Sequence, residues 1–221
     1  LIFARTGAAT DSIRLDLATP VGLADVNVLG GVTITVLNGN TPVTTYALDN
    51  SVIDLKLLGG TRFKATLPAG GVYDRVEIRF GAVVAALSNL SIYGAEVIYP
   101  NPTVAAAGQL ICAGSGTTLT ATANGGTTLK WYATAASTTV LATGETFAVA
   151  GPLTNNTTYY IEVSKDGCAN AKRIPVTVVV TTAPAVPTLA ATAEVCSGSA
   201  AVLPVNNPVT GTTYKWYTSS T

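Results

Sequence analysis

The chain has 221 residues, of which 48% are hydrophobic and 11% are charged, and its formal net charge at pH 7 is zero. A neutral, weakly charged chain lacks the clustered Lys and Arg with which proteins bind nucleic acids or anionic membrane surfaces. Its apolar residues come in runs far shorter than the ~18 needed to cross a bilayer, so we expect no nucleic-acid partner and no membrane span in this chain.

Residues 1–100 read as short strands separated by turns. Stretches such as IRLDLATP, GVTITVLNG, TRFKATLP and DRVEIRFGAV are divided by Gly, Asn and Pro. In DRVEIRF, apolar and charged residues alternate, which is typical of a strand with one face in a core and the other in water. We therefore predict an all-β domain over residues 1–100, a β-sandwich of jelly-roll-like type.

Two proline-bearing joints divide the chain, at residues 99–102 (YPNP) and 183–187 (APAVP). Both are short and neither is rich in Gly and Ser, so we expect semi-rigid spacers rather than flexible tethers. The predicted domains are therefore residues 1–100, 101–182 and 183–221.

A repeat relates the second and third of these domains. ICAGSGTTLTATANGGTTLKWYATA begins at Ile111, and VCSGSAAVLPVNNPVTGTTYKWYTSS begins at Val195. Cys112 aligns with Cys196 and Trp131 with Trp216, which gives a period of about 85 residues. Residues 183–221 match only the first half of the unit, so we expect this chain to be a segment of a longer protein.

The complete copy contains about seven predicted strands, the number found in an immunoglobulin sandwich. Trp131 lies on the third of these strands, and Leu119 and Ile161 occupy the positions where immunoglobulin domains carry two sheet-bridging cysteines. We expect these residues to form an apolar core together with Tyr159, and Trp216 to do the same in the next copy. The neighbouring tyrosines, Tyr132 and Tyr217, should point to the opposite face and lie on the surface.

The pattern C-x-G-S…TLTA…WY…TYY-x-E-V…G-C resembles the immunoglobulin-like repeats of giant cell-surface and secreted proteins of the Bacteroidetes. In that group, such repeats occur in gliding adhesins and in cargo of the type IX secretion system. Residues 1–100, with YDRVEIRFG and LSNLSIYGAEV, look like a β-sandwich module that precedes these repeats.

The resemblance implies a non-catalytic structural or adhesive segment at the cell surface or outside the cell. The partners that it implies are a surface polysaccharide or other extracellular ligand, neighbouring repeats of the same chain, and secretion or motility machinery.

An extracellular location would also allow disulfides to persist. A bond between Cys112 and Cys168 would stabilise the domain by about 4 kcal/mol in the chain-entropy model. Two unrelated thiols are the alternative interpretation. Cys196 then has no partner in this chain, and we expect its partner to lie beyond residue 221.

Catalysis is not expected. The chain has no His to activate Cys196 or to act as a general base, and its carboxylates are scattered singly. We predict no catalytic residue and no cofactor. The LDNSVID turn offers Asp49, Asn50 and Asp54 as weak Ca²⁺ ligands, although the same residues also suit ordinary turn capping.

Three tyrosines in the first domain are candidates for stacking on a sugar ring: Tyr46, Tyr73 and Tyr93. Each fits equally well as a core or cross-strand residue. Ser12, in the sequence DSI, resembles the acceptor of the Bacteroidetes O-glycosylation motif.

Two other interpretations remain open. Residues 1–100 could be the carbohydrate-binding module of an extracellular polysaccharide-degrading enzyme. Alternatively, the half unit could be completed by strands from a neighbouring subunit in a fibre.

Overall fold

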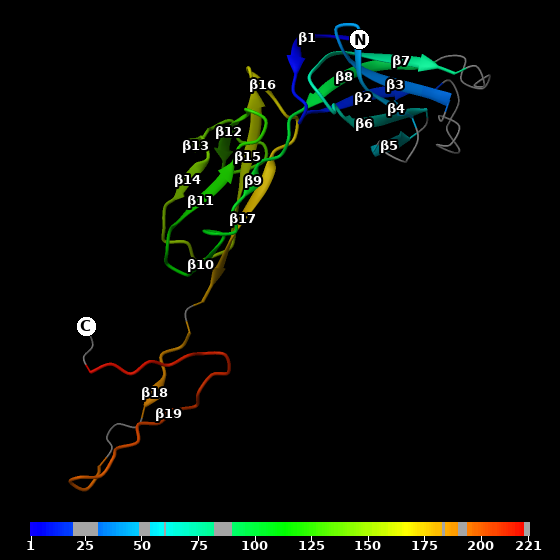
Figure 1. Cartoon of the computed structure of the whole chain (residues 1–221). Helices are drawn as coiled ribbons and strands as arrows, with labels where there is room; N and C mark the ends of the chain where they lie inside the picture. The colour runs from blue at the N-terminus through cyan, green and yellow to red at the C-terminus, as the bar shows by residue number, and fades with distance from the viewer. Residues whose placement is uncertain are drawn as a thin grey trace.

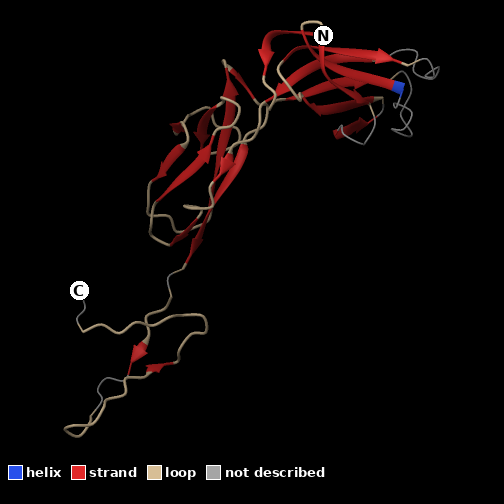
Figure 2. Cartoon of the chain, viewed as in Figure 1, coloured by secondary structure: helices blue, strands red, loops and turns tan. Residues whose placement is uncertain are grey.

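A computed structural model describes residues 1–19, 31–48, 54–59, 61–81, 90–182, 184–189 and 194–218. The described elements are almost entirely strands, arranged in chain order as two β-sandwiches and a small terminal hairpin (Figures 1 and 2). The all-β prediction is confirmed. No helix within these residues is both long and apolar enough to cross a membrane.

The first sandwich consists, in its described part, of two facing four-stranded antiparallel sheets. One sheet has the order β1 (Ile2–Gly7), β7 (Tyr73–Phe80), β3 (Val32–Asn38) and β4 (Thr41–Ala47). The other has the order β5 (Asp54–Gly59), β6 (Arg62–Pro68), β2 (Ser12–Ala18) and β8 (Ser91–Ile98). The chain passes repeatedly from one sheet to the other, so neither sheet is a simple meander.

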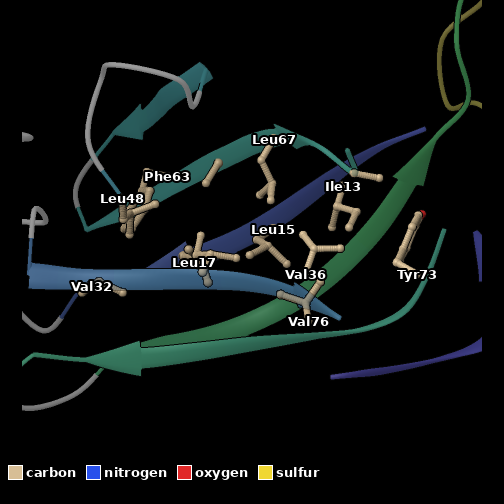
Figure 3. Close-up of a cluster of buried hydrophobic side chains, with 13 residues drawn as sticks. Ile13, Leu15, Leu17, Val32, Val36, Leu48, Phe63, Leu67, Tyr73 and Val76 are labelled. Atoms are coloured by element: carbon tan, nitrogen blue, oxygen red, sulfur yellow. The ribbon is translucent and has the colours of Figure 1, made fainter. Parts of the chain in front are cut away.

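The core of this sandwich follows from alternation along the strands. In β2, Ile13, Leu15 and Leu17 are fully buried, while the residues between them face outward. Phe63 and Leu67 from β6 and the apolar residues of β3 meet them between the sheets (Figure 3). Burial of these side chains, each contributing about 1.5–3 kcal/mol, is what holds the two sheets together.

Tyr73 belongs to this core, which corrects its assignment as a sugar contact. Its side chain is fully buried, and its ring meets Phe3 edge-on with the centroids 5.4 Å apart. Gly7 provides the space for the ring, because a Cβ at that position would overlap it. Burial, followed by the charge of Asp11, raises the pKa of the Tyr73 hydroxyl, which forms no hydrogen bond with the described residues.

The second sandwich also packs two sheets face to face. One has the order β10 (Leu110–Cys112), β17 (Ile174–Thr181), β15 (Thr157–Lys165), β12 (Thr128–Tyr132) and β13 (Ala142–Thr143), with β16 (Cys168–Ala169) paired to β15. The other has the order β14 (Thr146–Val149), β11 (Thr117–Thr122) and β9 (Thr103–Val104). Strand β10 pairs parallel with β17, whereas the other pairs are antiparallel.

Trp131 lies at the centre of this second core. It is fully buried, as are Leu119 and Ile161, and its indole N–H donates a hydrogen bond to the Gly144 carbonyl at 3.0 Å. The hydrogen bond satisfies the one polar group that this large side chain brings into the core. Two further rings extend the cluster, those of Phe147 and the half-buried Tyr159.

The strands described in residues 184–189 and 194–218 are β18 (Thr188–Leu189) and β19 (Val205–Asn206), which pair as a short hairpin. Trp216, which we predicted to be a core residue, is 52% exposed there, and Tyr217 is also exposed. In the complete copy, Trp131 belongs to a buried cluster with Phe147 of β14, Ile161 of β15 and Val176 of β17, all of which follow it in sequence. Among the described residues after 184, no such cluster surrounds Trp216.

The unpaired hydroxyl of Tyr73 leads to a stability prediction. We expect Tyr73→Phe to leave the free energy of unfolding unchanged or to raise it by up to about 1 kcal/mol, because it removes a buried group without a partner. Tyr46→Phe is the matched control, since the Tyr46 hydroxyl donates to the Pro68 carbonyl at 3.0 Å. It should lower the free energy of unfolding by about 1 kcal/mol in chemical denaturation. A larger loss in Tyr73→Phe than in Tyr46→Phe would contradict this description of the core.

Candidate functional site

The joint between the two sandwiches is where the structure shows the most specific polar contacts between distant segments. Residues 99–102 lead from β8 of the first sandwich to β9 of the second. Asn170, which follows β16, binds Tyr99 through both backbone groups. Its Oδ1 accepts from the Tyr99 N–H at 2.8 Å, and its Nδ2 donates to the Tyr99 carbonyl at 2.9 Å. The Asn170 side chain thus makes the two backbone hydrogen bonds at Tyr99 that a neighbouring strand would otherwise make.

A turn of the second sandwich contacts the same linker, because Asn124 donates from Nδ2 to the Asn101 carbonyl at 2.6 Å. Lys165 joins this turn to the neighbouring hairpin by donating from Nζ to the Gly125 carbonyl at 3.0 Å. Gly125 has a φ of +64°, and a Cβ there would lie 2.7 Å from the Thr10 Oγ1. The turn therefore needs glycine both for its backbone conformation and for its close approach to the first sandwich.

The side chains of Tyr99 and Arg5 complete the joint. The Tyr99 hydroxyl donates to the Lys165 carbonyl at 3.5 Å, and burial, with Cys168 as the next cause, raises the pKa of this hydroxyl. Arg5 of β1 donates to the Asp166 carbonyl at 3.1 Å and lies 3.6 Å from its carboxylate. Both side chains of this ion pair are more than half exposed, so it contributes little to stability.

The proline-bearing linker was predicted from the sequence, but the residue that fixes it was not. Asn170 lies about 70 residues after the linker, and a single Asn beyond a hairpin turn has no distinctive pattern. The close approach of Gly125 to Thr10 depends on the tertiary structure and has no signal in the sequence either.

Tyr132 is buried, which corrects its assignment as a surface aromatic. Arg173 covers its ring with the guanidinium carbon 3.4 Å from the centroid, and the Tyr132 hydroxyl donates to Glu162 Oε1 at 3.2 Å. Arg173 also donates to Glu162 Oε2 at 3.0 Å and to the carbonyl of Ser137 at 2.7 Å. The outer face of the sheet therefore carries a cluster of hydrogen-bonded polar groups, in which Arg173 shields the Tyr132 ring from water.

The predicted Cys112–Cys168 disulfide is wrong in this structure. All three cysteines are free and exposed. Cys112 pairs with Thr181 at one end of β17, whereas Cys168 pairs with Lys165 beyond the other end of that strand (Figure 1). Strand rise puts the two on the order of 30 Å apart, and a disulfide requires Cα atoms within about 7 Å.

The other predicted site residues lie apart from one another. Tyr93 is 62% exposed on β8, Tyr46 is half-buried on β4, and Ser12 is half-buried at the start of β2. Asp49 and Asn50 lie outside the described residues, as does the side chain of Asp54. Within the described part of the chain, no three His, Cys, Asp or Glu side chains come together as metal ligands.

A family model described as Ig-like domain CHU_C associated matches residues 100–181 and 184–221. The chain belongs to this CHU_C-associated Ig-like family. The match covers the second sandwich and the half unit after it, in agreement with the repeat seen in the sequence. The second sandwich is thus a CHU_C-associated Ig-like domain, and the family supports a structural module without catalytic function. No curated protein sequence matches the chain.

Among solved structures, the CHU_C-associated Ig-like chain is similar to DIP-gamma IG1+IG2, with 14% identity over 80% of this chain and 91% of that one and a TM-score of 0.26. It is similar to the BSP domain of a biofilm associated protein, with 18% identity over 69% of this chain and 25% of that one and a TM-score of 0.25. It is also similar to a chain of the Dpr2 Ig1-Ig2 complex with DIP-Theta Ig1-Ig3, with 13% identity over 82% and 63% and a TM-score of 0.27. All three TM-scores are too low to support the fold, so the fold is assigned from the strand pairing described above.

Removing the Asn170 side chain should destabilise the joint. We expect Asn170→Ala to lower the free energy of unfolding by about 1–3 kcal/mol, because both backbone groups of Tyr99 lose their partners. Asn155→Ala is the matched control, since the exposed Asn155 side chain makes one hydrogen bond with the described residues, to the neighbouring Thr154 hydroxyl at 3.2 Å. Equal stability of the two variants in urea denaturation would show that the Asn170 contacts contribute nothing.

The separation of the cysteines predicts that reducing agents do not affect folding. Dithiothreitol should leave the thermal midpoint of the monomer unchanged, and three thiols per chain should react in the native state. A Cys112–Cys168 bond would instead make the reduced protein less stable by about 4 kcal/mol. Mass spectrometry of non-reduced peptides gives an independent reading of the same question.

Proposed function

We propose that this chain is a non-catalytic stalk and contact segment of a large exported cell-surface protein. The main support is the joint, where the Asn170 side chain and two turns, through Asn124 and the Lys165 carbonyl, hold a short proline-bearing linker. A linker held in this way transmits force and orientation between domains, which a flexible tether cannot do. The sequence resemblance to repeats of gliding adhesins and type IX secretion cargo supports an extracellular location and an adhesive role.

The second joint provides an internal comparison. No hydrogen bond between the described residues links the second sandwich to residues 184–218. The hairpin that carries Asn170 lies after Trp131 in the complete repeat, and residues 184–221 do not reach the corresponding position. In a row of complete units, we expect each later hairpin to hold the linker before it.

Distance measurements between spin labels test this proposal on the whole chain. The native cysteines are replaced by Ser, and labels are attached to one exposed residue on either side of each joint. The first pair is Thr41→Cys with Thr138→Cys, and the second is Thr138→Cys with Ser199→Cys. We expect a narrow distance distribution across the first joint and a broad one across the second. Asn170→Ala should broaden the first distribution. Equal widths for the two joints would contradict the stalk proposal.

A further inference from the structure

The outer face of the sheet formed by β6, β2 and β8 carries an unusual row of residues. Because β2 is the middle strand, Asp16 lies directly between Lys64 on β6 and Gly94 on β8. The next row outward along β2 pairs Arg14 with Glu96. Positively and negatively charged side chains therefore flank Gly94, which has no side chain of its own.

Gly94 opens a hollow in this face. A Cβ on Gly94 would meet no atom within 4 Å, and its φ lies outside the range that requires glycine. The space beside it has a volume of about 170 Å³. Its walls are formed by Arg14, Asp16, Lys64, Gly94, Ala95 and Glu96.

The polar groups around the hollow are only partly used by the protein. Asp16 Oδ2 accepts a hydrogen bond from Arg62 Nη2 at 2.7 Å, but Asp16 Oδ1 is buried and has no partner among the described residues. Lys64 likewise makes no hydrogen bond or ion pair with them. A buried acceptor and a neighbouring donor are therefore both available to a ligand in the hollow.

Tyr93 precedes Gly94 on β8, and Arg62 connects its ring to Asp16 in the wall of the hollow. The pairing of β8 with β2 shifts between Gly94 and Ile92, so Tyr93 is the extra residue of a β-bulge. Bulges redirect a side chain and are enriched near binding sites. The ring is 62% exposed, and the Arg62 guanidinium carbon lies 4.4 Å from its centroid. Arg62 thus holds the ring beside the hollow while its bond to Asp16 fixes the carboxylate.

The charges decide which class of ligand fits. A metal cation would find the carboxylates of Asp16 and Glu96 already paired with Arg62 and Arg14, whose charges repel it. An inorganic anion would face the unpartnered oxygen of Asp16, which repels it in turn. A neutral molecule with many hydroxyl groups meets neither difficulty, because each hydroxyl both donates and accepts. Its hydroxyls could donate to Asp16 and accept from Lys64, while an apolar ring face packs on Tyr93.

We propose that this face of the first sandwich is a saccharide-binding site, with Asp16 and Lys64 as polar contacts, Gly94 as the floor and Tyr93 as the stacking ring. The inference rests on the proposed adhesive function and gives it a ligand class. The site is shallow and built on rigid strands, which suits an internal unit of a long polysaccharide rather than an enclosed small molecule.

The test uses the full chain on an array of neutral, acidic and sulfated oligosaccharides, followed by titration calorimetry with the best binder. We expect a neutral sugar to bind, and Tyr93→Ala and Gly94→Val each to weaken its binding by about tenfold or more. Gly94→Val fills the hollow and should fold normally, because there is open space at Cβ and Val favours strands. Tyr217→Ala, at an exposed tyrosine in the half unit, is the control and should bind like the wild type.

Three outcomes would overturn the proposal: no binding on the array, binding that both variants retain, or binding only of sulfated sugars that inorganic sulfate displaces. Circular dichroism of each variant separates loss of the site from loss of the fold. The spin-label distances across the first joint are independent of the hollow. A narrow distribution with no sugar binding would therefore reject the saccharide site and leave the stalk proposal standing.

Discussion

The two sandwiches have separate hydrophobic cores, so their relative orientation depends on how the linker at Tyr99 is held. The linker backbone has one N–H and one carbonyl at Tyr99, and Asn170 satisfies both. Without it, these groups would bind water and the linker would lose its fixed direction. Proline restricts the linker to extended conformations but does not choose among them. The amide of Asn170 and the two turns make that choice.

The sequence predicted those features that depend on local alternation. A period of two along β2 and β6 fixed which residues face the core, and the position of Trp131 relative to Leu119 identified the second sandwich. Such patterns are visible without knowing what lies opposite. The repeat also indicated the family, which the match to residues 100–181 and 184–221 then showed.

Features that depend on a partner far along the chain were not predictable in this way. Tyr132 was expected on the surface because its strand alternates, yet Arg173 covers it from another strand. Tyr73 is equally compatible with a surface or a core position until Gly7 is seen to leave space for its ring. The cysteines were paired by their place in a sequence pattern, whereas strand register puts them at opposite ends of a sheet. Trp216 also shows that a core position depends on distant partners, because it has the same Lys-Trp-Tyr motif as Trp131 and yet is exposed.

The proposed saccharide site and the joint are connected through β8. This strand contributes Gly94 and Glu96 to the hollow and runs from Ile98 directly into Tyr99. A ligand bound in the hollow would pull on β8, which pairs with β2 from Ser91 to Ile98. The load would then pass to Tyr99, which Asn170 holds at two points. The proposed contact and stalk functions would thus share one strand, because β8 contributes Gly94 and Glu96 to the hollow and leads into the joint.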